Sequence, residues 1–101
     1  MSYGDTLGLV GDPTRRQILE LLRHRPRSVG ELAGEMPVSR PAVSRHLRLM
    51  KEGGLVVDHA EGTKRIYAIR PAGFRDIVEY WSRFWDEPLR RFKDHAEGGD
   101  T

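Results

Sequence analysis

The stretch Ser28–Leu55 reads SVGELAGEMPVSRPAVSRHLRLMKEGGL and decides the fold of this chain. It opens on a capping box, because Ser28 is followed three residues later by Glu31, and these side chains satisfy free backbone amides at a helix start. Apolar residues then recur at helical spacing as far as Met36. Pro37 disfavours helical geometry in the residue before it, so the sequence predicts a short helix that ends at this point.

A second helix is predicted directly after this turn. Ser39 has the side chain of an N-cap, and Pro41 falls in the first turn, where its missing amide hydrogen costs nothing. Gly53 and Gly54 supply the left-handed residue that commonly ends a helix. The apolar positions lie on one side of this helix, at Val43, Leu47 and Met50.

The outer face of this second helix is basic. Residues 39–51 contain four basic side chains and no acidic one, whereas acidic side chains gather elsewhere, as at Glu31 and Glu35. Two short helices joined by a tight turn are typical of a helix-turn-helix, whose second helix enters the major groove of DNA. Charged faces are more often simply solvated, but here the caps, the turn and the one-sided charge agree on DNA recognition.

Two further helices are predicted ahead of this motif. Asp12 and Pro13 form a cap followed by a first-turn proline, which begins a helix that runs from Thr14 to about His24. The core side of this helix is formed by Ile18, Leu19, Leu21 and Leu22. The basic residues expected outside are Arg15, Arg16 and Arg23. Asp5 is predicted to cap a shorter first helix, which contains Leu7, Leu9 and Val10.

A β-hairpin is predicted over residues 55–70, as two strand-like runs around a glycine-containing turn. Tyr67 and Ile69 share one face of the second run and are expected to pack inward. A hairpin in this position is a wing, and its basic Lys64 and Arg65 can reach the sugar-phosphate backbone or the minor groove. Solubilising loop charges are the alternative interpretation of these two residues.

Pro71 opens a last helix that is predicted to extend to about His95. Pro88 interrupts it and Asp86 can cap the chain again, so a kink or a restarted helix is expected. Apolar residues recur every three or four positions as an aromatic stripe, at Phe74, Ile77, Val78, Trp81, Phe84, Trp85, Leu89 and Phe92. The stripe is interpreted first as core and dimer interface. Alternatively, the stripe lines a cavity between the subunits that admits an apolar ligand. A third interpretation is that the protein has no inducer and is controlled by its own abundance.

These elements together predict a mainly α chain with a small β-hairpin. The fold is a winged helix-turn-helix in the order α-α-α-α-β-β-α, which dimerises through its terminal helices. At 101 residues the chain is too short for two independent cores, so one domain over residues 1–95 is expected. Its parts are the helix-turn-helix over 28–54, the wing over 55–70 and the dimerisation helix over 71–95, followed by a disordered tail over 96–101.

Composition argues against several classes of protein. The chain has no cysteine, which excludes disulfides and thiolate metal sites. No apolar run approaches the ~20 residues of a membrane span and no signal-peptide pattern is present, so a cytoplasmic protein without membrane contact is expected. The histidines lie apart from any nucleophile or phosphate-binding glycine loop, which argues against an enzyme. The formal charge of +2 does not by itself indicate a nucleic-acid partner, so the local basic face carries that prediction.

Four segments resemble the ArsR-type family of bacterial winged-helix repressors. They read DPTRRQILELL, SVGELAGEM, SRPAVSRHLRLMKEGGLV and EGTKRIYAI, and the resemblance extends from about Leu7 to Arg70. It implies a homodimer that binds an inverted-repeat operator through the helix over residues 39–52 and represses its own or a neighbouring operon. A winged-helix module that docks an acidic protein is the alternative, although the helix start lacks the exposed apolar side chains that such a surface needs.

The resemblance also implies which residues contact double-stranded DNA. Base contacts come from the first part of the second helix of the motif, at Arg40, Ser44 and Arg45. The family often has glutamine at the first of these positions and histidine at the last. Because arginine prefers guanine, the operator is expected to differ from those of relatives. Backbone contacts are predicted for Ser39, His46, Arg48, Lys51, Lys64 and Arg65, and His46, which borders the buried stripe, is otherwise expected to be packed.

The dimer interface is predicted on the first and last helices, at Leu7, Val10, Phe74, Ile77, Trp81, Phe84, Trp85, Leu89 and Phe92. Metal sensors of this family use cysteines in the first helix of the motif, or paired aspartate and histidine on the last helix. Here residues 29–36 contain no cysteine, and His95 is the single histidine of the last helix, so no metal cofactor is expected. An unknown small molecule is the candidate inducer.

Overall fold

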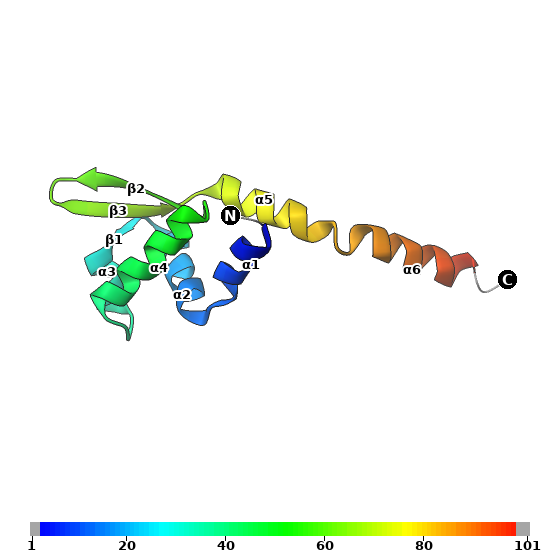
Figure 1. The fold of residues 1–101 in the computed structure, drawn as a ribbon, viewed down its shortest axis with the longest axis horizontal. Coiled ribbons are helices and arrows are strands. Elements are labelled where there is room, and N and C mark those ends of the chain that lie inside the picture. The colour runs from blue at the N-terminus through cyan, green and yellow to red at the C-terminus, as the bar shows by residue number, and fades with distance from the viewer. Residues whose placement is uncertain (1–2, 99–101) are drawn as a thin grey trace.

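Six helices and three strands follow one another in residues 3–98, which are the residues that the computed structural model describes. The helices are α1 (Tyr3–Gly11), α2 (Pro13–His24), α3 (Val29–Glu35), α4 (Arg40–Glu52), α5 (Pro71–Ser82) and α6 (Asp86–Gly98). The strands are β1 (Arg27–Ser28), β2 (Val56–Glu61) and β3 (Lys64–Ile69). The mainly helical winged fold predicted from the sequence is therefore confirmed (Figure 1).

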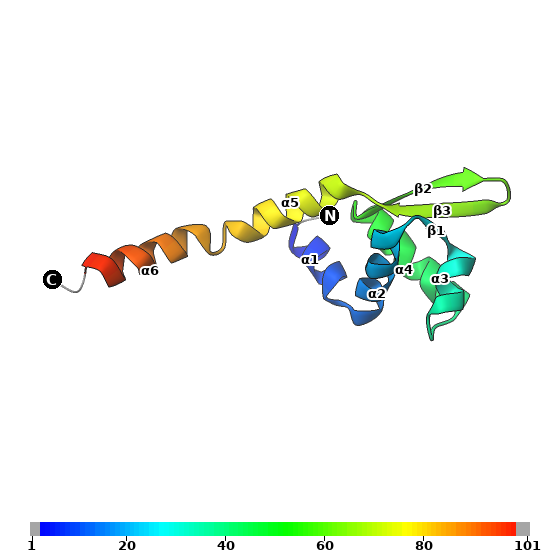
Figure 2. The ribbon, with the colours of Figure 1, turned by 180° about the vertical axis from the view of Figure 1, so that it is seen from behind.

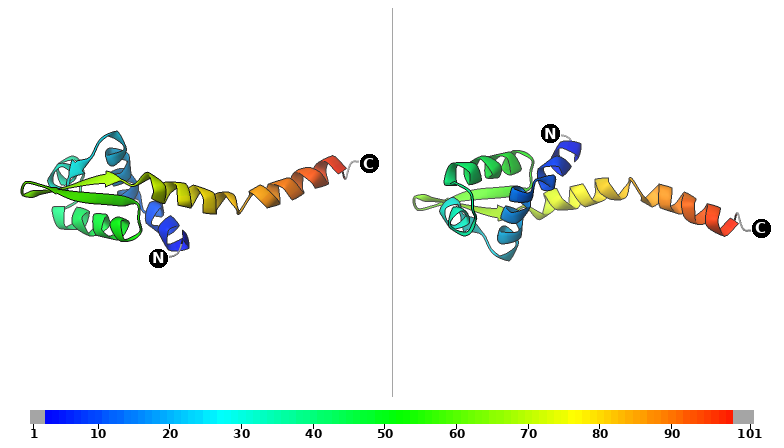
Figure 3. Two further views of the ribbon diagram at one scale, coloured as in Figure 1. Left: turned by 90° about the horizontal axis from the view of Figure 1, so that it is seen from above. Right: turned by 90° about the horizontal axis from the view of Figure 1, so that it is seen from below.

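The molecule consists of a globular head and a long arm. Helices α1 to α4 and the sheet form the head, and α5 and α6 leave it in one direction, so that the chain measures 68 × 24 × 23 Å (Figures 1 and 2). The hairpin of β2 and β3 points the opposite way, which places the tip of the wing and the end of the arm at opposite ends of the molecule (Figure 3). None of the described helices is both long and apolar enough to cross a membrane.

The predicted helix caps are all present in the helix-turn-helix. The Ser28 hydroxyl accepts the Glu31 amide at 3.2 Å, and the Glu31 carboxylate accepts the Ser28 amide at 3.3 Å, which completes the capping box. Ser39 accepts the Ala42 amide at 3.3 Å and so caps α4. Gly54, with φ of 78°, is the left-handed residue after α4.

The core of the head lies where α4 packs against the other helices and the sheet. The apolar stripe predicted for α4 is fully buried, and the residues with the least exposure are Ile18, Leu32, Val43, Leu47, Met50, Leu55 and Val56. Tyr67 and Ile69 pack against this core from β3, as predicted. Because α4 buries one side so completely, only its opposite side remains for a partner.

The sheet contains a strand that the sequence analysis missed. The strand order is β1-β3-β2, and both pairings are antiparallel. In the first pairing Arg27 lies opposite Tyr67. The hairpin closes through Gly62 and Thr63, and Gly62 has φ of 63°, the left-handed geometry that such a turn requires of its first residue. A two-residue strand has no periodicity, so β1 is defined only by its partner β3.

Three other expectations differ from the structure. Helix α1 begins at Tyr3, so Asp5 lies inside it and is not its cap. The restart expected near Pro88 is confirmed, because α6 begins at Asp86 and holds Pro88 in its first turn, where a proline is tolerated. Residues 96–98 belong to α6 and are not part of a tail, while 99–101 lie outside the described residues. Arg15, expected outside, has a side chain only 16% exposed.

The arm is joined to the head by a close contact at the start of α5. The Arg70 amide donates to the Leu55 carbonyl at 2.9 Å, and the Arg70 guanidinium donates to the Gly54 carbonyl at 3.2 Å. A Cβ atom at Gly73 would lie 2.0 Å from that Gly54 carbonyl oxygen. Only glycine allows α5 to approach the end of α4 this closely, so Gly73 determines where the arm begins.

Candidate nucleic-acid interface

The exposed side of α4 carries three of the side chains predicted to contact DNA. Ser44, Arg45 and Arg48 are exposed, on the side of the helix opposite its buried stripe. Within the part of the chain that the structure describes, neither Arg45 nor Arg48 forms an ion pair. Their guanidinium groups are therefore available to phosphate oxygens or to the edges of bases.

The starts of α3 and α4 and the tip of the wing line a polar cleft of about 580 Å³. Arg40, at the first position of α4, lies beside Gly30, with guanidinium atoms 3.7 to 3.9 Å from where a Cβ at Gly30 would stand. Lys64 and Arg65 line the same cleft, although they follow Arg40 at a distance in the sequence. The structure thus brings three predicted DNA-contacting cations from two elements to one place.

One of these cations, Arg65, shares an acidic partner with Lys51 of α4. The Asp58 carboxylate, on β2, forms ion pairs with Lys51 Nζ at 2.8 Å and with Arg65 Nε at 3.3 Å. Hydrogen bonding from Lys51, with the charge of Arg65 in support, lowers the pKa of Asp58 below its ordinary value. Sequence reasoning missed Asp58 because nothing local marks it, and only the packing of β2 against α4 brings it to Lys51.

His46 lies at the border between the buried stripe and the exposed side of α4, where it contacts α2. It is half-buried, and its Nδ1 lies 3.3 Å from Arg15 Nη1 of α2. An arginine can only donate, so His46 accepts at Nδ1 and carries its proton on Nε2. Arg15 also donates to the Leu9 carbonyl at 2.9 Å, so it links α1, α2 and α4. His46 is therefore packed between α4 and α2, and its expected contact with the DNA backbone stays a prediction.

The arm exposes an apolar surface that no described part of the chain covers. Trp81 is 45% exposed, Phe84 57% and Phe92 71%, and Trp85 and Leu89 are exposed as well. Trp81 lies 5.0 Å from Trp85 between ring centroids, in an edge-to-face pair. Large apolar side chains gathered on one exposed helical arm mark an interaction surface.

Four of the predicted interface residues are instead used partly or wholly within the chain. Ile77 is only 7% exposed and belongs to the core of the head. Leu7, Val10 and Phe74 are half-buried and pack against that core. The reason is that the first half of α5 lies beside α1, so its apolar side has a partner already, whereas α6 has none in the described chain.

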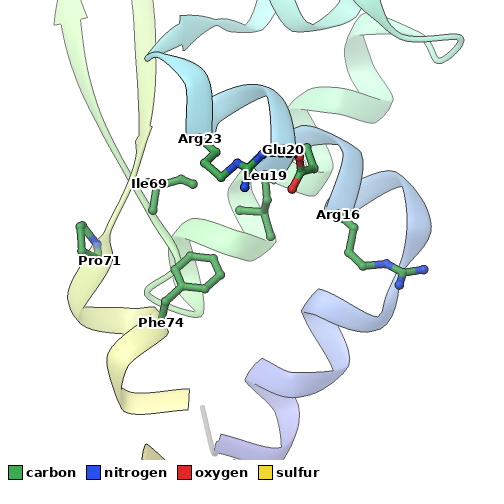
Figure 4. Close-up of a pocket in the computed structure, with 7 residues that line it drawn as sticks. All are labelled: Arg16, Leu19, Glu20, Arg23, Ile69, Pro71 and Phe74. Atoms are coloured by element: carbon green, nitrogen blue, oxygen red, sulfur yellow. Dashed lines mark ion pairs between the residues drawn. The ribbon is translucent and has the colours of Figure 1, made fainter. Parts of the chain in front are cut away.

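A second, apolar groove of about 500 Å³ lies between α2, β3 and α5 (Figure 4). Leu19, Ile69 and Phe74 point into it from these three elements. Its rim carries Arg16 and the ion pair of Arg23 with Glu20, which are 3.3 Å apart. Among the described residues no three histidine, aspartate or glutamate side chains are grouped to hold a metal ion.

A helix-turn-helix with a free cationic face, followed by a basic wing, defines a winged-helix DNA-binding protein. The chain belongs to the bacterial ArsR family of regulators, because the family described as "Bacterial regulatory protein, arsR family" matches residues 12–57 and transcriptional regulators of 45% and 31% identity match most of the chain. Relatives that match along most of the chain agree with this assignment.

Two relatives and one solved structure illustrate the similarity. The HTH-type transcriptional regulator Rv2034 of Mycobacterium tuberculosis is 45% identical over 94 residues, which cover 91% of this chain and 88% of that protein. The transcriptional repressor SdpR of Bacillus subtilis is 31% identical over 75 residues, covering 74% and 83%. The structure of an ArsR-like transcriptional regulator from Rhodococcus sp. RHA1 has a TM-score of 0.83 at 27% identity and covers 94% and 90% of the two chains.

The chain is therefore a DNA-binding transcriptional regulator, a class of protein that is not enzymatic. Regulators of this family bind DNA and typically act as dimers. The alternative prediction, a module that docks an acidic protein, finds no support among these relatives.

Proposed function

We propose that this protein is a homodimeric repressor of its own or a neighbouring operon, which binds an inverted-repeat operator. One observation carries the proposal: the exposed side of α4 presents arginines that no acidic side chain of the described residues neutralises. A helix of this length and charge fits the major groove, and the wing lies beside its start. Similarity to a protein named as a repressor supports the direction of regulation.

Base reading is assigned to the first part of α4. Arg40 and Arg45 can each form a bidentate contact with guanine, and Ser44 can bond either a donor or an acceptor. Ser39 uses its hydroxyl oxygen to cap α4, so its hydrogen remains free for a phosphate. The other backbone contacts are assigned to His46, through Nε2, and to Arg48, Lys51, Lys64 and Arg65.

Dimerisation is assigned to the apolar surface of the arm, at Trp81, Phe84, Trp85, Leu89 and Phe92. Burial of these side chains against a second copy removes a large apolar area from water, which is the main source of free energy in stable dimers. A dimer also places two α4 helices on one duplex, as an inverted repeat requires.

The inducer is assigned to the groove between α2 and α5. Its apolar floor and Arg16 on its rim, which has no ion-pair partner among the described residues, suit a small apolar molecule with a negatively charged end (Figure 4). A set of small aromatic and aliphatic carboxylates, screened by ligand-observed NMR, should yield binders. Their affinity should fall in Phe74→Ala and Arg16→Ala, and binding that both substitutions leave unchanged would place the inducer elsewhere.

Fluorescence anisotropy on the DNA immediately upstream of the gene tests DNA recognition. The duplex is compared with a scrambled one at two salt concentrations, with Arg45→Ala as the test variant. Arg75→Ala is the matched control, because Arg75 is also an exposed helical arginine but lies on the arm. We expect Arg45→Ala to weaken binding to the upstream duplex by ~1–3 kcal/mol and Arg75→Ala to leave it unchanged.

Two results would speak against this assignment. Equal, weak binding of both duplexes that disappears with salt would mean that only nonspecific charge attraction is present. Equal losses for Arg45→Ala on both duplexes would make this arginine a phosphate contact and not a base reader.

A further inference from the structure

Asp58 connects the helix that reads DNA with the wing. Its two carboxylate oxygens have different partners, since Oδ1 faces Lys51 in the last turn of α4 and Oδ2 faces Arg65 near the start of β3. The Asp58 side chain is 7% exposed, whereas those of Lys51 and Arg65 are 52% and 56% exposed. The carboxylate therefore lies beneath two cations whose outer sides face solvent.

We propose that Asp58 is a positioning residue, which sets the wing relative to α4 so that both contact one duplex in register. The proposal rests on the assigned DNA contacts of Lys51 and Arg65. β2 itself follows α4 after a short connection, but Lys51 and Arg65 belong to different elements, and Asp58 is the side chain that both of them contact.

The geometry leaves both cations able to bind phosphate. An ammonium group has three donors and a guanidinium five, and the Asp58 carboxylate engages Lys51 at one oxygen and Arg65 at the other. Long side chains lose rotamer freedom when they bind, so a Lys51 and an Arg65 already held in place lose less on meeting DNA. Asp58 thus contributes order rather than charge to the interface.

The charge of Asp58 alone predicts that its neutralisation strengthens DNA binding, whereas the positioning role predicts that it weakens binding to the preferred duplex. The direction of the change in affinity therefore tests the proposal. A carboxylate near DNA repels phosphates and offsets part of the attraction of Lys51 and Arg65. If Asp58 had only this electrostatic effect, its neutralisation would strengthen binding to every duplex. If it positions the wing, its neutralisation weakens binding to the preferred duplex and leaves binding to other sequences unchanged or stronger.

The test compares Asp58→Asn with the matched control Glu61→Gln. Glu61 is also a carboxylate of β2, but it is exposed, and within residues 3–98 its one ion-pair partner is His59 of the same strand, at 3.5 Å. The wild-type protein first selects a preferred duplex from a random-sequence pool, and dissociation constants are then measured for that duplex and a scrambled one. We expect Asp58→Asn to lower the ratio of the two affinities by about tenfold. Glu61→Gln should leave the ratio unchanged, and Asp58→Glu, which keeps the charge, should retain most of it.

A measurement without DNA separates this proposal from DNA recognition itself. Amide hydrogen exchange over residues 56–69 should be faster in Asp58→Asn than in the wild type or in Glu61→Gln. If the pool yields no preferred duplex, DNA recognition as proposed fails, while the exchange rates still decide whether Asp58 orders the wing. Unchanged exchange, or affinities that rise in parallel for both duplexes, would overturn the positioning role. Equal losses of affinity for both duplexes, together with a lowered melting temperature, would mean that Asp58 only stabilises the fold. This result would also overturn the positioning role.

Discussion

The sharpest stability prediction concerns Gly73, where α5 meets the end of α4. In Gly73→Ala the new Cβ would lie 2.0 Å from the Gly54 carbonyl oxygen and 3.0 Å from its carbonyl carbon. Both are backbone atoms, so no side chain can rotate away and α5 itself must move. This movement strains the adjacent hydrogen bond between the Arg70 amide and the Leu55 carbonyl.

The size of the effect follows from three contributions. Overpacking a buried site costs ~1–3 kcal/mol, and a weakened hydrogen bond costs up to ~1 kcal/mol. Alanine is favoured over glycine inside a helix by ~0.5–1 kcal/mol, which acts in the opposite direction. We therefore expect Gly73→Ala to lower the free energy of unfolding by roughly 2 kcal/mol, which is the sum of the central values of these ranges.

Urea denaturation at one fixed protein concentration measures this change, since any dimer makes stability depend on concentration. Gly34→Ala is the matched control, because Gly34 is also helical but is exposed, and nothing beyond its own stretch of helix lies within 4 Å of where its Cβ would stand. The same substitution should stabilise at Gly34 by up to ~0.5–1 kcal/mol and destabilise at Gly73. A Gly73→Ala protein as stable as the wild type would refute the close contact between α5 and α4.

Two further predictions concern acid stability and assembly. The pKa of the Asp58 carboxyl is lower in the folded chain than in the unfolded chain, so the unfolded chain is protonated more readily at this residue. The ionised carboxylate therefore stabilises the folded chain above about pH 4, and this stabilisation is lost as the pH falls further. Urea midpoints between pH 2 and pH 6 should therefore fall less steeply with acid in Asp58→Asn, and equal slopes would contradict the ion pairs. Trp81→Glu should shift the mass in sedimentation equilibrium from dimer to monomer, because it places a charge in the apolar surface. Lys93→Glu, also exposed on the arm, should leave the mass unchanged, and a Trp81→Glu protein of wild-type mass would remove this surface from the interface.

The helix-turn-helix and the hairpin could be predicted from the sequence because their signals are local. A cap such as Ser28 acts on an amide three residues away, and Pro37 acts on its immediate neighbour. The stripe of α4 is visible because burial repeats with the period of the helix. Its exposed side follows from the same period, and the family resemblance then implied Arg40, Ser44 and Arg45 on that side as the base contacts.

Only the tertiary structure decided which basic side chains have an acidic partner within the protein and which do not. The sequence shows no acidic residue between 39 and 51, yet Asp58 approaches Lys51 because β2 folds back against α4. The strand β1, the contact of Arg15 with His46 and the groove at Leu19 likewise join residues far apart in the chain. Such contacts depend on how helices and strands pack, and packing leaves no periodic trace in the sequence that a local pattern could reveal.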